Sequence, residues 1–117
     1  MNRSDLDRLR DARDFARDAF DHATGLSADV LAQVTQPQHA ALYALVVVGE
    51  ALGKILADIR SAAPAIQWNA ITALRNHLVH AYWQIDLEII ADVIKNRIDP
   101  LVAELGKLIV FVEQMDT

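Results

Sequence analysis

The sequence predicts an all-α protein, folded as an up-and-down bundle of four to five helices. Apolar residues make up 53% of the 117-residue chain but aromatic residues only 6%. Most of the apolar residues are Ala, Leu, Ile and Val, a composition that suits helices packed on helices. They recur at steps of three and four residues along most of the chain, without the alternation typical of strands. Residues 1–117 are therefore expected to form a single domain around one core.

The first two helices are expected within the first 34 residues. Ser4 can cap a helix that runs to Ala23, with acidic residues in its first turn, and Gly25 ends it. One face of this helix is apolar. The other alternates between Asp and Arg, which favours a solvated charge lattice over a basic stripe for RNA formed by Arg10, Arg13 and Arg17. Ser27 then caps a short second helix.

A long third helix is expected from Pro37 to about Ala62, because proline suits the first turn of a helix. Its apolar stripe is wider than one neighbouring helix can cover, so the helix is central or shares its surface with a second subunit. The stripe contains Leu42, Leu45, Gly49, Leu52, Leu56 and Ile59, widened by Ala41, Val48 and Ile55. On its other face, the four-residue spacing of Glu50 and Lys54 favours a local ion pair over a functional site.

Two further helical segments are expected after the break at Pro64. The first covers residues 66–79, and Asp86 caps the second, which has apolar residues at helical spacing as far as Val112. Pro100 interrupts this last segment. Since proline lacks a backbone donor and clashes with the carbonyl four residues earlier, we expect a kink there or a restart capped by Asp99. The core-facing residues are Trp68, Ile71, Leu74 and Leu78 in the first segment, and Leu87, Ile90, Ile94, Ile98, Leu101, Leu105, Leu108 and Val112 in the second.

Composition and charge exclude several classes of protein. The chain has no cysteine, so neither a disulfide frame nor a thiolate metal site holds it together. The formal net charge of -5 argues against a protein that coats nucleic acid, although overall charge does not report on a small cleft. The amino terminus is highly charged and no apolar run approaches a membrane span, so we expect a cytoplasmic protein without membrane association.

Residues 75–82, with the sequence Arg-Asn-His-Leu-Val-His-Ala-Tyr, place many polar groups at the end of an apolar helix. Either a structural network that fixes the helix end or a small site for an anion such as phosphate would explain them. On an ideal helix Asn76 and His80 lie on one side, whereas Arg75 and His80 are separated by roughly 140°. Arg75 and His80 thus share a pocket only if the arginine curls round or the helix frays before His80.

The chemistry of these groups suits RNA cleavage without a metal or cofactor. A histidine at a helix carboxyl terminus is favoured in its protonated form and can exchange protons near neutral pH. His80 could take the proton from a ribose 2′-hydroxyl, whose oxygen attacks the adjacent phosphate, while Arg75 stabilises the phosphate oxygens. The leaving 5′-oxygen also needs an acid, and a symmetric dimer with two copies of His80 would supply it.

A structural role competes with the functional one at each of these positions. Arg75 could simply form ion pairs, and His80 could be a satisfied structural imidazole. Asn76 could hold the backbone or a histidine tautomer, and Tyr82 could bury its ring while its hydroxyl stays in water. His77 and His80 could start a metal site, but no third ligand is apparent.

The pattern Arg75-Asn76-x-x-x-His80-x-Tyr82 resembles the signature of the HEPN superfamily, and specifically of its HepT-type toxins, which carry R-x4-H-x-Y. The similarity covers nearly the whole chain. Other segments that fall where HepT-like chains have similar ones are Gly25-Leu26-Ser27, Val48-Gly49-Glu50-Ala51, Pro64 to Trp68, and Asp86-Leu87-Glu88-Ile89-Ile90.

This resemblance implies the toxin of a type VII-like toxin–antitoxin system. Such a HEPN-like protein is a homodimeric endoribonuclease that cleaves transfer or messenger RNA in a cleft between subunits, without metal. Arg75 and His80 would be catalytic and Asn76 supporting. An MntA-type nucleotidyltransferase antitoxin would silence the toxin by transferring AMP to Tyr82, since added phosphates beside the cleft repel RNA. The alternatives are a non-catalytic HEPN module that binds a nucleotidyltransferase or nucleotide, and a plain helical dimerisation protein.

Overall fold

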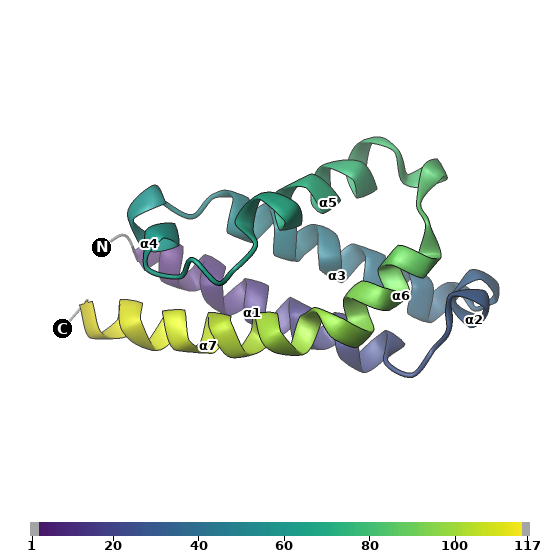
Figure 1. The fold of residues 1–117 in the computed structure, drawn as a ribbon, viewed down its shortest axis with the longest axis horizontal. Coiled ribbons are helices and arrows are strands. Elements are labelled where there is room, and N and C mark those ends of the chain that lie inside the picture. The colour runs from purple at the N-terminus through teal and green to yellow at the C-terminus, as the bar shows by residue number, and fades with distance from the viewer. Residues whose placement is uncertain (1–2, 116–117) are drawn as a thin grey trace.

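The computed structural model describes residues 3–115, apart from the side chains of Arg3, Ser4 and Tyr82. Over these residues the chain forms seven α-helices, one 3-10 helix and no strand, so the predicted all-α class is confirmed (Figure 1). The elements are α1 (Arg3–Ala23), α2 (Ala28–Gln33), α3 (Thr35–Gly53), α4 (Ala57–Ser61), α5 (Trp68–His80), η1 (Tyr82–Gln84), α6 (Leu87–Asn96) and α7 (Ile98–Met115).

The long helices pack side by side in an elongated bundle of 48 × 26 × 21 Å. Helix α1 packs against α3 on one side and α7 on the other, and α5 packs chiefly against α3 (Figure 1). The shorter α2 packs against α6 and α3. The predicted central position of the third helix is therefore confirmed. No helix in the described part of the chain is long and apolar enough to cross a membrane.

The core contains the apolar faces predicted from residue spacing. Leu9, Leu52, Ile94, Leu105 and Val112 are at most 1% exposed, and burying each such side chain contributes about 1.5–3 kcal/mol. The interior face of α1 is completed by small residues that allow neighbouring helices to approach closely. These fully buried small residues are Ala12, Ala16 and Ala19.

Three of the predicted helix boundaries are confirmed by their local contacts. Gly25 ends α1 with a φ of 80°, a left-handed conformation that glycine adopts without steric cost. The Ser27 hydroxyl accepts the Val30 N–H at 3.3 Å at the start of α2, and the Asp86 carboxylate accepts the Glu88 N–H at 2.9 Å at the start of α6. The predicted cap at Ser4 is wrong, because α1 already includes Arg3.

The predicted third helix is divided into α3 and α4. Helix α3 ends at Gly53, and the Arg60 side chain donates hydrogen bonds to the carbonyls of Leu52, Gly53 and Ile55 at 3.2, 2.9 and 2.9 Å. The bond to Gly53 supplies a donor to the carbonyl at the helix end, whereas the Leu52 carbonyl also accepts the Ile55 N–H and Ile55 lies beyond the helix. Leu56 consequently lies outside both helices and is 54% exposed, although the spacing placed it in the apolar stripe.

The predicted fifth helix is also divided, but the break is at Arg97 rather than at Pro100. Pro100 lies in the first turn of α7, where a backbone donor has no helical partner and its absence costs nothing. Asp99 lies inside the same turn and is not the cap. The restart therefore occurs upstream of the proline, since a continuous helix would bring the proline ring against the Asn96 carbonyl.

The charged face of α1 forms one ion pair with another helix and one between neighbouring residues. Arg10 pairs with Glu113 of α7 at 2.8 Å, and Arg13 pairs with the adjacent Asp14 at 3.2 Å. The face is solvated, as the alternating charges predicted, and one of its arginines links α1 to α7.

Candidate functional site

The motif residues lie on α5 and directly after it. The helix is continuous from Trp68 to His80, and the Ala81 N–H donates to the His77 carbonyl at 2.9 Å. His80 is therefore the last helical residue, at the carboxyl terminus of a helix that was expected to cover residues 66–79. The fraying before His80 that would bring it towards Arg75 does not occur.

The start of α5 is fixed to the end of α3 through Arg60 and Trp68. The Trp68 indole donates to the Ala63 carbonyl at 3.1 Å, and the Arg60 guanidinium carbon lies 5.4 Å from the centre of the Trp68 ring. This stacking is a cation–π interaction. Because Arg60 also caps α3, one side chain sets the position of both helices.

Arg75 faces α3 rather than solvent, with 27% of its side chain exposed. Its Nη2 lies 2.6 Å from Oε2 of Glu50 on α3, and its Nη1 donates to Oδ1 of Asn76 at 2.9 Å. The guanidinium is thus held between a carboxylate of a neighbouring helix and an amide of its own helix. The Asn76 side chain contacts Arg75, whereas the alternative structural role expected for it was to hold the backbone or a histidine tautomer.

A close approach between α3 and α5 at Gly49 places Arg75 in this position. A Cβ atom at residue 49 would collide with the Cβ of Arg75 and would lie within 2.8 Å of its Cγ. Only glycine leaves room for the arginine to cross the α3 surface here. From the sequence, Gly49 was only one position of an apolar stripe. The structure shows that glycine is needed there because Arg75 of another helix, α5, lies against it.

Glu50 contacts two cations. The predicted local ion pair with Lys54 is confirmed at 3.2 Å, but the same carboxylate also binds Arg75. The hydrogen bond from Lys54, together with the positive charges of Arg75 and Lys54, lowers the pKa of Glu50 below its ordinary value. Glu50 therefore stays ionised over the physiological pH range.

A hollow of about 410 Å³ lies beside Arg75. Its cationic side chains are Arg8 of α1, Lys54 directly after α3 and Arg75 of α5. Arg8 also pairs with the buried Asp5 at 3.3 Å. The lining residues are Arg8, Asp11, Val46, Val47, Glu50, Ala51, Lys54 and Arg75. Arg75 therefore lies at the edge of a charged depression rather than inside the sealed core.

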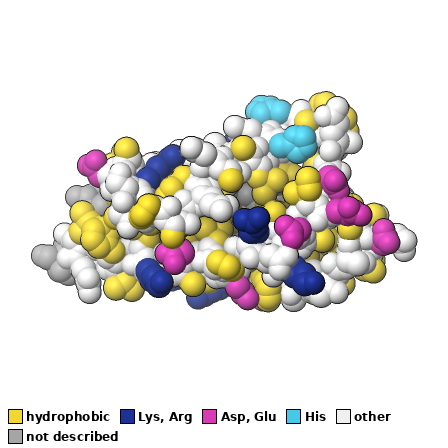
Figure 2. Space-filling view, viewed as in Figure 1, with side chains coloured by type: hydrophobic (Ala, Val, Ile, Leu, Met, Phe, Trp, Pro, Cys, Tyr) yellow, Lys and Arg dark blue, Asp and Glu magenta, His cyan; other side chains and the backbone are white. Residues whose placement is uncertain are grey.

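His77 and His80 lie on the exposed surface of α5, and Figure 2 shows histidine side chains at the surface over this part of the fold. Five residues of a regular helix separate Arg75 from His80 by roughly 140° and about 7.5 Å along the axis. Because Arg75 is held by Glu50 and Asn76, its side chain does not curl towards His80. Within one chain the helix does not bring the two groups together. Among the described residues, no three His, Cys, Asp or Glu side chains gather as metal ligands would.

The segment after α5 contains the motif tyrosine and an exposed tryptophan. The backbone of Tyr82 begins η1, but its side chain, the expected modification site, lies outside the described part of the structure. Trp83 is 69% exposed, and Val79 and Ile89 nearby in the chain are also exposed. Exposed apolar side chains therefore lie close to His80 along the chain. Trp83 was not among the residues predicted from the sequence, although an aromatic residue in a segment without helical periodicity was a usable signal.

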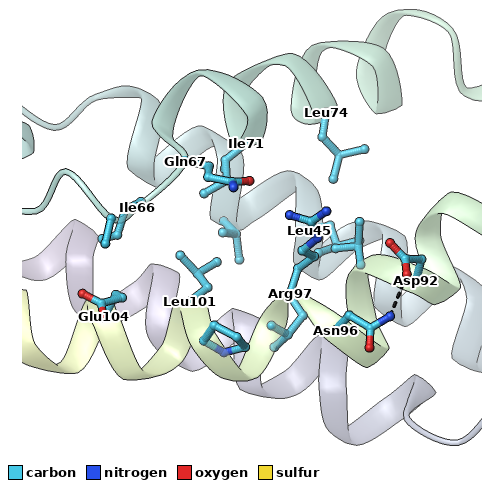
Figure 3. A pocket seen from close by; sticks show the side chains of 15 residues that line it. Leu45, Ile66, Gln67, Ile71, Leu74, Asp92, Asn96, Arg97, Leu101 and Glu104 are labelled. Atoms are coloured by element: carbon cyan, nitrogen blue, oxygen red, sulfur yellow. Dashed lines mark hydrogen bonds between the residues drawn. The ribbon is translucent and has the colours of Figure 1, made fainter.

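A larger groove of about 530 Å³ lies between α5 and the break between α6 and α7. Its floor is apolar, Arg97 reaches into it from the break, and Asn96 donates to Asp92 at 2.7 Å at one end (Figure 3). Ile71 and Leu74 face this groove and are only partly buried, although residue spacing placed them in the core. The groove depends on how the helices are arranged, which residue spacing does not predict.

The helical bundle and the Arg-x4-His-x-Tyr motif at the end of one helix define an HEPN-type protein. The chain belongs to the Ribonuclease HepT-like family, whose model matches residues 6–108. It is 28% identical to the protein named "Putative RNase MJ0127" of Methanocaldococcus jannaschii, over 92% of this chain and 89% of the relative. It is 32% identical to the "Probable ribonuclease HepT" of Thermococcus cleftensis, over 61% of this chain and 64% of the relative. No solved structure gives a significant match.

Proposed function

We propose that this chain is the toxin of a toxin–antitoxin pair, a cytoplasmic endoribonuclease that cleaves RNA as a homodimer and without a metal ion. The observation that supports this proposal most is the position of the two motif residues. Arg75 is held by Glu50 at the edge of a hollow, and His80 is exposed at the end of the same helix. The names of the relatives, which are ribonucleases, agree with this reaction class.

The proposed reaction needs a base, an acid and a group that stabilises charge on the phosphate. One copy of His80 takes the proton from a ribose 2′-hydroxyl, and the oxygen attacks the adjacent phosphorus. A bond from the 2′-oxygen to phosphorus forms as the bond to the 5′-oxygen breaks. A second copy of His80, in its protonated form, gives its proton to that leaving oxygen. Arg75 donates to the phosphate oxygens as negative charge builds on them. The products are a 2′,3′-cyclic phosphate and a 5′-hydroxyl.

The need for two subunits follows from the regular geometry of α5. Because Arg75 and His80 point in different directions from one helix, a second chain must complete the site. An antiparallel pairing of two α5 helices, centred between His77 and Leu78, would bring His80 of the partner subunit to the same level along the helix axis as Arg75. The outer face of α5 is suited to such a contact, because its side chains are exposed. These residues are Asn69, Ala70, Ala73, Asn76, His77 and His80.

The first test is cleavage of RNA oligonucleotides in the presence of EDTA. Wild-type protein should produce 5′-hydroxyl ends, whereas Arg75→Ala and His80→Ala, with unchanged circular dichroism, should not. Equal activity of wild type and both variants would refute the proposal. A protein that bound a nucleotidyltransferase but left all RNA intact would instead be the non-catalytic module.

The dimeric site can be tested by mixing subunits. If one site uses both copies of His80, an exchanged equimolar mixture of wild type and His80→Ala should have about a quarter of the activity of the same total amount of wild type, because only the wild-type homodimer has both histidines. Independent sites in separate chains would leave about half. Light scattering should show a dimer at micromolar concentration.

The partner and the modification of Tyr82 are also part of this proposal. An MntA-type nucleotidyltransferase would transfer AMP to the Tyr82 hydroxyl, and the added phosphates would repel RNA from the neighbouring cleft. Incubation with such an enzyme and ATP should increase the intact mass by units of AMP. The same increments in Tyr82→Phe would exclude Tyr82 as the acceptor.

A further inference from the structure

We propose that Glu50 is a positioning residue that holds the Arg75 guanidinium in the orientation needed to bind the scissile phosphate. This inference rests on the proposed ribonuclease function of Arg75. It gives Glu50 a role beyond the local ion pair that its spacing from Lys54 suggested. Glu50 would not contact RNA, and would act through the arginine.

The contacts of Arg75 support this role. Its Nε is buried and has no hydrogen-bond partner among the described residues, so its two terminal nitrogens fix the orientation of the guanidinium plane. Nη2 is held by Glu50 at 2.6 Å and Nη1 by Asn76 at 2.9 Å. A guanidinium carries two N–H donors on each terminal nitrogen. After these contacts, each terminal nitrogen keeps one N–H for a phosphate oxygen.

The two anchors of Arg75 differ in what they fix. Asn76 belongs to α5 and moves with Arg75, so it cannot set the position of the guanidinium relative to the rest of the bundle. Glu50 belongs to α3, which packs against α1, α2 and α5. Its carboxylate therefore ties the end of a long, flexible side chain to the central helix. Catalytic donors are most effective when they are held in place before the substrate binds.

The surroundings of Glu50 keep it suited to this role. Gly49, the preceding residue, allows the backbone of α5 to come close enough for the contact. Lys54 pairs with the same carboxylate at 3.2 Å and helps to keep it ionised, as its lowered pKa indicates. Gly49 and Glu50, in the last turns of α3, and Lys54, directly after the helix, thus supply the gap, the carboxylate and the second cation.

The experiment compares Glu50→Gln, Glu50→Asp and the matched control Lys54→Gln in the full-length protein. Glu50→Gln keeps the shape but loses the charge, and Glu50→Asp keeps the charge but is shorter. Lys54→Gln removes the other partner of the same carboxylate. Steady-state cleavage of an RNA oligonucleotide in EDTA gives kcat and KM. We expect kcat to fall about 10- to 100-fold in Glu50→Gln with KM changed less than about threefold, since a small misplacement of a catalytic group is enough for such a loss. Glu50→Asp should be intermediate, and Lys54→Gln, which leaves the contact between Glu50 and Arg75 in place, should lose clearly less activity than Glu50→Gln.

A second measurement reports on the arginine itself. The Nε–H group of Arg75, assigned by its absence in Arg75→Lys, can be followed by 15N relaxation. In Glu50→Gln this group should become more mobile on the picosecond to nanosecond timescale, and in Lys54→Gln it should not. An unchanged Arg75 signal in Glu50→Gln, or an unchanged kcat, would overturn the positioning role. If wild-type protein cleaves no RNA, the proposed function fails, and the relaxation data alone still decide whether Glu50 orders Arg75.

Discussion

The close contact of Gly49 with Arg75 predicts an unusual effect of a glycine-to-alanine change in a helix. Alanine normally stabilises a helix interior by roughly 1 kcal/mol relative to glycine. At residue 49 the new Cβ would overlap the Cβ of Arg75, an atom attached directly to the backbone of α5. Overpacking of this kind costs about 1–3 kcal/mol, and the upper part of this range applies because neither atom is at the end of a flexible side chain. The net result for Gly49→Ala is destabilisation by about 1–2 kcal/mol.

Gly106 of α7 provides the matched control. No described heavy atom outside its own helix and chain neighbours lies within 4 Å of a Cβ built there, so Gly106→Ala should gain about 0.5–1 kcal/mol from helix propensity alone. For 117 residues, 1 kcal/mol corresponds to about 4 °C in Tm. Scanning calorimetry should show Tm lower by about 4–8 °C in Gly49→Ala and higher by about 2–4 °C in Gly106→Ala. Equal or greater stability of Gly49→Ala would show that α3 and α5 are not in close contact at this point.

Four further predictions concern other contacts. Arg60→Ala should destabilise the protein by about 1–3 kcal/mol in urea unfolding, because the carbonyls of Leu52, Gly53 and Ile55 each lose a hydrogen bond from the guanidinium and Trp68 loses its cation. The exposed Arg17→Ala should change stability by less than about 0.5 kcal/mol. Asp86→Ala should cost about 1 kcal/mol by the same assay through loss of the α6 cap, and no loss would mean that the cap is not formed in solution. The lowered pKa of Glu50 implies a stabilisation of the fold that is present above its ordinary pKa of 4.5 and is lost as the pH falls further. The Tm difference between wild type and Glu50→Gln should therefore shrink on acidification. A constant difference would show that the ion pairs of Glu50 do not stabilise the fold. Trp83 offers an exposed ring near His80 for stacking a base, so Trp83→Ala should weaken RNA binding by about 5- to 150-fold in fluorescence anisotropy; unchanged affinity would place RNA elsewhere.

Much of the fold could be predicted because it depends on local spacing. The apolar positions of α1, α6 and α7 recur at helical intervals and lie in the core, and Ser27, Asp86 and Gly25 act as boundaries through contacts within a few residues. The break after Gly53 was missed because the donor that caps α3 is Arg60, a residue beyond the end of the helix. The residues of α3 itself did not indicate that the helix stops at Gly53, because the apolar spacing continues into the following segment.

The candidate site was predicted only in part, for a similar reason. The spacing of Arg75 and His80, and their position at the end of a helix, were evident from the sequence. The partner of Arg75 was not, because the spacing of Glu50 and Lys54 already had a sufficient local explanation. Which helix packs beside which is decided by the whole bundle, and residue periodicity does not encode it. For the same reason the groove containing Arg97 could not be predicted.

The attachment of α5 chiefly to α3 has a mechanical consequence. A helix that packs against one neighbour along one face can tilt or slide as a unit, whereas a helix enclosed on every side cannot. Arg75 and His80 both belong to α5, so a movement of this helix displaces the backbone of both residues together. In the proposed ribonuclease, a molecule that docks on the free side of α5 would therefore shift the backbone of both residues together, while Glu50 holds the Arg75 guanidinium to α3.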